Sequence, residues 1–145
     1  MKMYLKKALK LSWIALILSS SFVYAGDLPR STSPENAKVY IISPADGESV
    51  NETLTIKYGL QGMGVAPAGV DKENTGHHHL LIDGETLPAF DKPMGNDVKH
   101  FGGGQTEATI QLSKGKHTLQ LILGNHMHVP HDPAVVSEKI TVFVQ

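Results

Sequence analysis

The feature that most constrains the fold is a two-residue alternation of apolar and polar side chains that recurs in short segments. In residues 50–60 the side chains of one parity are apolar except for Glu52, and threonine and lysine are among the residues between them. The alternation returns in residues 106–112, 117–123 and 135–144. A period of two is typical of strands with one buried face, whereas an amphipathic helix has a period near 3.6. The pattern therefore predicts an all-β chain.

Two more apolar segments, residues 38–43 and 78–83, bring the expected number of strands to six or seven, and turn-forming Pro, Asp and Gly residues separate them. No segment has a convincing helical period. This pattern is typical of an immunoglobulin-like antiparallel β-sandwich, with a cupredoxin-like fold as the main alternative. The connections at residues 61–76 and 85–99 are longer than a compact sandwich needs, which makes them candidates to cover a site.

The amino terminus has the features of an export signal. Basic residues precede an apolar run, residues 11–18, and small residues lead to Ala25, after which we expect cleavage. The alternative is a retained membrane anchor, but the run is shorter than the roughly 20 residues of a spanning helix. The basic residues are Lys2, Lys6, Lys7 and Lys10.

The resulting plan for the chain is a signal peptide at 1–25, a disordered lead at 26–36 and one sandwich domain at 37–145. It predicts a periplasmic or secreted protein with no membrane span after cleavage. The signal region carries four of the 13 basic residues, which leaves nine Lys and Arg against 14 Asp and Glu. This acidic balance argues against nucleic-acid binding. The chain has no cysteine, which excludes a disulfide framework and a thiolate metal site.

All eight histidines lie between positions 77 and 131. Imidazole is the commonest protein ligand for Zn and Cu(II), and it binds in its neutral form. Such a concentration suggests a metal site. The histidines form a run, a single residue, and a loop group, with one more apart at a strand start: His77-His78-His79, His100, His126-x-His128-x-x-His131, and His117.

Side chains two apart on a strand point to the same side. His77 and His79 meet this condition, and so do His126 and His128 if their segment is extended. His78 points the other way and is a poorer candidate. We therefore predict a metal site, and its first candidates are His77, His79, His126 and His128, with His100 and His131 as further candidate ligands.

Copper is the expected metal and zinc the alternative. Nitrogen-rich sites favour Cu(II) most strongly among the divalent ions, with zinc next. Met63, Met94 and Met127 lie in predicted loops, and a thioether beside imidazole suits copper, particularly Cu(I). A histidine brace is excluded, because the expected mature terminus begins Gly26-Asp27-Leu28.

The histidines also allow other interpretations. Each one alone is more often a structural hydrogen-bonding residue than a ligand. The main alternative function is a non-metal immunoglobulin-like module that recognises an envelope protein or a glycan. A serine hydrolase is not expected, because no G-x-S-x-G elbow is present and Ser113 and Ser137 have no obvious base partner. A metal-dependent enzyme is less expected, because the sequence identifies neither an open coordination position nor a general base. The glycines after Phe101 are interpreted as a tight bend.

Four longer motifs resemble a bacterial domain-of-unknown-function family of short exported β-domains. The resemblance extends from about Val39 to the end of the chain. It implies an exported β-domain, and it carries no activity and no site residues. The motifs are GHHHLLID at 76–83, HFGGGQTE at 100–107, GKHTLQL at 115–121 and VVSEKI at 135–140.

Overall fold

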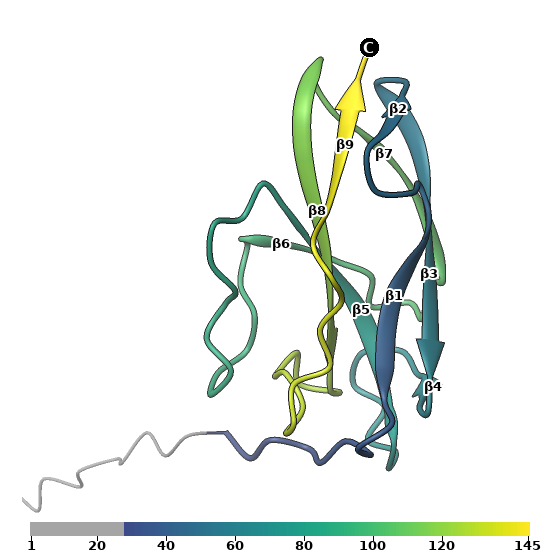
Figure 1. Ribbon diagram of the computed structural model, residues 1–145. Coiled ribbons are helices and arrows are strands. Elements are labelled where there is room, and N and C mark those ends of the chain that lie inside the picture. The colour runs from purple at the N-terminus through teal and green to yellow at the C-terminus, as the bar shows by residue number, and fades with distance from the viewer. Residues whose placement is uncertain (1–27) are drawn as a thin grey trace, which may run out of the picture.

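The computed structural model describes residues 28–145 (Figure 1). The expected signal peptide lies outside the described residues. The regular secondary structure of these residues consists of strands, with no helix among them, which confirms the predicted all-β class. The strands are β1 (Lys38–Ser43), β2 (Glu48–Val50), β3 (Thr53–Gln61), β4 (Gly64–Val65), β5 (Thr75–Ile82), β6 (Val98–His100), β7 (Glu107–Gln111), β8 (Gly115–Gly124) and β9 (Ile140–Val144).

The strands form the two sheets of a sandwich, as predicted. The small sheet has the order β1-β3-β7, and the large sheet has the order β2-β9-β8-β5-β4, with β6 also paired to β5. Most pairs are antiparallel. The short pairs β2–β9 and β4–β5 are parallel, which departs from a purely antiparallel sandwich.

The main core lies between the two sheets. Leu54 and Ile56 of β3 belong to the same buried cluster as Leu119, Leu121 and Leu123 of β8. These side chains have the parity that the alternation predicts. Burial of each one stabilises the fold by about 1.5–3 kcal/mol before the entropic cost of ordering it.

Several segments differ from the expected elements, and the structure has nine strands in residues 28–145 where six or seven were expected, because short strands such as β4 lie in predicted loops. The predicted strand at 135–144 enters the ladder only at Ile140, because residues 135–137 reach β8 through separate hydrogen bonds. Ser137 Oγ accepts a hydrogen bond from Leu121 N at 2.8 Å, and the Leu123 N–H donates to the Val135 carbonyl at 3.0 Å. The predicted loop at 85–99 ends in β6.

The described part of the predicted disordered lead lies against the loop that follows β8. The Ser33 N–H donates to the Asp132 carbonyl at 3.1 Å, and the Asp132 N–H donates to the Ser31 carbonyl at 2.9 Å. Arg30 pairs with Asp132 at 3.2 Å. No helix in residues 28–145 meets the length and hydropathy of a membrane span.

The two faces of β5 serve different parts of the molecule. Leu80 belongs to the main core, whereas Leu81 belongs to a second, smaller cluster on the outer face of the large sheet. Met94 and Val98, from the connection between β5 and β6 and from β6 itself, complete this cluster together with Ile122. Figure 1 shows that connection projecting to one side of the large sheet. The outer face of β5 is therefore covered by chain, and side chains on it are buried without entering the main core.

Candidate metal centre

Strand register brings the histidine groups together. His77 pairs with Gly124, the last residue of β8. The loop that follows β8 therefore lies beside the start of β5. On the other side of β5, His79 pairs with His100 of β6, and cross-strand partners place their side chains on the same face.

Four histidines, here called the histidine cluster, converge on one point. One ring nitrogen from each lies within 4.8 Å of the other three. An ion bound at about 2.05 Å holds tetrahedral nitrogens about 3.3 Å apart and opposite nitrogens of a square plane about 4.1 Å apart. Small side-chain movements therefore suffice to bind an ion. The members are His77, His79, His100 and His128.

The buried half of the histidine cluster has ring nitrogens with no hydrogen-bond partner. His77 and His79 are 0% and 1% exposed. Nδ1 of His77 and both ring nitrogens of His79 lack a partner in the protein. The remaining nitrogen of His77 lies 3.0 Å from His128 Nδ1. An unsatisfied buried polar atom costs about 1–3 kcal/mol, and a metal ion that takes a ring lone pair removes part of this cost.

The environment keeps these imidazoles in the form that binds metal. Burial, followed by the charges of His128 and His100, lowers the pKa of His77 to about 4. Burial, followed by the charge of His77, lowers the pKa of His79 to about 3. Burial and then His100 also lower the pKa of His128. At neutral pH these three rings are neutral, so each has one nitrogen with a lone pair, and the lone pair of either His77 or His128 accepts the hydrogen bond between them.

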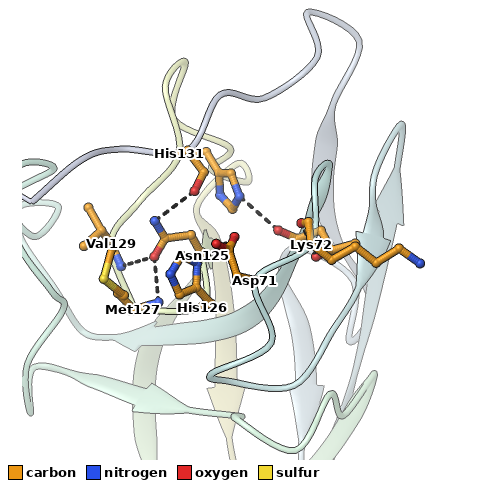
Figure 2. Close-up of polar contacts among 9 residues, drawn as sticks. Asp71, Lys72, Asn125, His126, Met127, Val129 and His131 are labelled. Carbon is orange, nitrogen blue, oxygen red and sulfur yellow. Dashed lines mark hydrogen bonds and ion pairs between the residues drawn. The ribbon is translucent and has the colours of Figure 1, made fainter.

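Asn125 shapes the loop that presents His128 (Figure 2). Its Oδ1 accepts hydrogen bonds from the backbone N–H groups of Met127 at 2.9 Å and Val129 at 3.0 Å. Its Nδ2 donates to Ser31 Oγ at 3.1 Å. The turn holds His128 at a φ of 66°, a left-handed conformation that non-glycine residues rarely adopt and that clusters at functional sites.

Two glycines make room for the imidazole rings. A Cβ on Gly124 would lie 2.6 Å from Cε1 of His79. A Cβ on Gly102 would lie 2.3 Å from Cε1 of His100. The glycines after Phe101 form the predicted bend, since the Gly104 N–H donates to the Phe101 carbonyl at 3.3 Å.

Two of the six predicted ligands, His126 and His131, lie outside the histidine cluster, and Figure 2 shows both of them near Asn125. The segment of His126 and His128 is a turn rather than extended chain, so the two-residue spacing does not align them. His126 Nδ1 instead lies 3.3 Å from Asp71 Oδ1. His131 is 1% exposed, and its Nε2 lies 3.1 Å from the Thr75 carbonyl. Its role is to fasten the loop to β5.

His78 points into the sandwich, as its parity predicts. Its ring lies 5.1 Å from that of Tyr58, and its Nδ1 lies 3.1 Å from the Gln105 carbonyl. Burial lowers its pKa. His78 therefore faces away from the histidine cluster.

Ser113 has a histidine neighbour that the sequence did not reveal. His117 Nδ1 lies 2.7 Å from Asp83 Oδ2, and its Nε2 lies 3.3 Å from Ser113 Oγ. The same Nε2 is closer to the Ser113 carbonyl, at 2.9 Å. The hydrogen bond to Asp83 raises the pKa of His117. A ring that donates from both nitrogens cannot take a proton from the serine, so this trio ties the hairpin turn to β5 and is not a hydrolase triad.

A family model described as a domain of unknown function, DUF4399, matches residues 56–145. The chain belongs to the DUF4399 family. This confirms the predicted kind of family, and the match includes the whole histidine cluster of this DUF4399 chain. No curated protein and no solved structure matches the chain significantly.

Sequence reasoning on this DUF4399 chain did not identify two positioning residues of the site. The Gly124-Asn125 dipeptide is a turn signal, because asparagine often accepts hydrogen bonds from backbone two residues on. That signal indicates a turn at Asn125, although it cannot reveal that the turn carries a member of the histidine cluster. The steric role of Gly124 depends on the packing of His79, which a single sequence does not contain.

Proposed function

We propose that this protein binds one copper ion through the histidine cluster. The observation that carries the proposal is the convergence of four imidazoles on one point, two of them buried with ring nitrogens that have no other partner. Polar atoms in a protein interior are normally hydrogen-bonded. A bound ion gives these nitrogens the partner that the surrounding protein does not provide.

The donor set favours copper over other common ions. Four neutral nitrogens suit Cu(II) first and zinc second in the divalent series. Magnesium and calcium prefer oxygen ligands, and no carboxylate belongs to the histidine cluster. Zinc is therefore the competing ion.

The uneven burial of the ligands favours a carrier, buffer or sensor over a permanent structural site. His77 and His79 are buried on β5, whereas His100 is exposed and His128 is half-buried. Accessible ligands allow an ion to be exchanged one bond at a time. The main core between the sheets is built from apolar side chains, and His77 and His79 lie on the opposite face of β5 from Leu80, so we expect the sandwich to fold without an ion.

We place this activity outside the cytoplasm, in the periplasm or beyond, on the strength of the signal-like first 25 residues. The partner is then the metal ion itself, with an envelope protein that delivers or receives it as a further candidate. Detection of the protein in a periplasmic or culture-medium fraction tests this placement.

Titration of the purified protein with Cu(II) and with Zn(II) tests the binding. We expect one tightly bound Cu(II) per chain and weaker zinc. His79→Ala and His128→Ala each remove at least one ligand, and we expect each to weaken Cu(II) binding about 10-fold or more.

His126→Ala is the matched control, because it removes a histidine of the same loop that pairs with Asp71 instead. Its Cu(II) affinity is expected to equal that of the wild type. Copper binding no tighter than that of any surface histidine, or equal losses in all three variants, would contradict the proposal. A non-metal binding module would then be the better explanation.

A further inference from the structure

A pocket of about 220 Å³ opens onto the histidine cluster. Three of the four clustered histidines line it, which makes it the route by which an ion would reach the site. Apart from these rings, its walls come from the connection between β5 and β6 and from the first residue of β6. The other lining residues are Met94, Gly95, Asn96 and Val98.

Met94 has the only sulfur in the wall of this pocket. It is 9% exposed. A Cβ added to Gly124 would lie 2.9 Å from Met94 Cε, 2.6 Å from His79 Cε1 and 3.1 Å from His79 Nδ1. Because both distances start from one point, Met94 Cε and His79 Cε1 lie no more than about 5.5 Å apart, on the side of Gly124 where its Cβ would stand.

The backbone fixes this methionine relative to a second ligand. The Met94 N–H donates to the His128 carbonyl at 3.0 Å. The connection that carries Met94 is thus fastened to the loop that carries His128. Met94 is held beside one buried and one accessible member of the histidine cluster.

A thioether changes what a set of imidazoles binds. Soft sulfur ligands favour Cu(I), while imidazole suits both Cu(II) and zinc. Zinc sites in proteins use thiolate, imidazole and carboxylate ligands. A methionine at the open side of a histidine site is therefore expected to improve Cu(I) binding and to leave zinc binding nearly unchanged.

We propose that Met94 supplies a thioether ligand at the open side of the histidine cluster, so that the site holds copper in both oxidation states and discriminates against zinc. This inference rests on the proposed copper function and adds the oxidation state and the residue that selects it. Among the methionines of the described chain, Met127 neighbours two histidines in sequence, yet it does not line this pocket.

Packing alone would also account for a buried methionine, because Met94 contacts the small cluster of Leu81, Val98 and Ile122. Met94→Leu conserves the volume of the side chain, and such exchanges usually cost under about 1.5 kcal/mol. It keeps the apolar contacts and removes the sulfur. A purely structural methionine would therefore leave metal selectivity as it is.

The test compares Met94→Leu with the matched control Met127→Leu in the full purified protein. Cu(I) affinity is measured by competition with a Cu(I)-specific chelator, and zinc affinity is measured in parallel. We expect Met94→Leu to weaken Cu(I) binding about 10-fold or more and to change zinc binding by less than about threefold. Met127→Leu is expected to match the wild type for both ions.

X-ray absorption of the Cu(I)-loaded wild type gives a direct second measurement. We expect a sulfur neighbour of copper that is lost in Met94→Leu and kept in Met127→Leu. Nitrogen neighbours alone in the wild type, or equal Cu(I) affinity in all three proteins, would overturn the inference while leaving the copper function intact. If only the histidine variants lose copper binding, the proposed copper function stands and the role of Met94 is refuted. If the wild type binds no copper, both proposals are refuted.

Discussion

At the scale of single residues, Asn125 shows how one side chain builds the geometry of another. Its two side-chain hydrogen bonds to backbone N–H groups close the turn that holds His128 in a left-handed conformation. His128 is thus positioned by a neighbour that does not belong to the histidine cluster. Positioning residues of this kind commonly change metal affinity 10- to 100-fold when they are replaced.

Asn125→Ala removes the acceptor of both N–H groups, and one of them, that of Val129, is buried. We expect the free energy of unfolding to fall by about 1–3 kcal/mol and copper binding to weaken, because His128 loses its support. Urea unfolding and metal titration measure the two effects. Asn51→Ala, at an exposed asparagine, should change neither, and an Asn125→Ala protein with wild-type affinity would refute the positioning role.

At the scale of elements, the end of β8 determines how tightly the histidine cluster packs. Gly124 lies opposite His77 in the β5–β8 ladder. Its missing side chain leaves the space that the His79 ring and the Met94 methyl group occupy. Strand β8 therefore ends in Gly124, at a position where the packing of the His79 ring requires a residue without a side chain.

Gly124→Ala is expected to displace His79 and weaken copper binding about 10-fold or more, with a folded sandwich retained. Copper titration and circular dichroism measure this. Gly95→Ala is the control, since Gly95 also lines the pocket but a Cβ there has open space. Equal affinities in the two variants would show that the room above Gly124 does not matter.

The sequence predicted the strands better than their connections. The alternation in residues 117–123 predicted which side of β8 is buried, and the parity of β5 separated His77 and His79 from His78. The small parallel strand β4 has two residues, too few for any periodicity. The two-residue spacing of His126 and His128 was misleading, because their segment is a turn whose shape depends on hydrogen bonds that the Asn125 side chain accepts from the backbone.

At the scale of the whole molecule, the buried imidazoles make the metal-free fold sensitive to acid. His77 and His79 have pKa values lowered from 6.5 to about 4 and about 3. In the unfolded chain each takes up a proton near pH 6.5, but in the folded chain only at much lower pH. Their contribution to stability is therefore complete above pH 6.5 and is lost as the pH falls below it.

We expect the free energy of unfolding of the metal-free protein to decrease by roughly 2 kcal/mol per pH unit between about pH 6 and pH 4.5. Urea unfolding with a chelator present measures this slope. A His77→Phe, His79→Phe double variant should show a shallower decline, because its rings cannot take up a proton. A wild-type slope no steeper than that of the double variant would contradict the prediction.

The outer-face position of the histidine cluster has an evolutionary consequence. The residues of the main core and those of the histidine cluster form separate sets, and both sets have members on β5. With the metal site proposed above, a substitution in the connections around Met94 or His128 would alter ion preference and leave the main core in place. Descendants of one ancestral chain would then be free to diverge in the ion they prefer while their architecture stays constant.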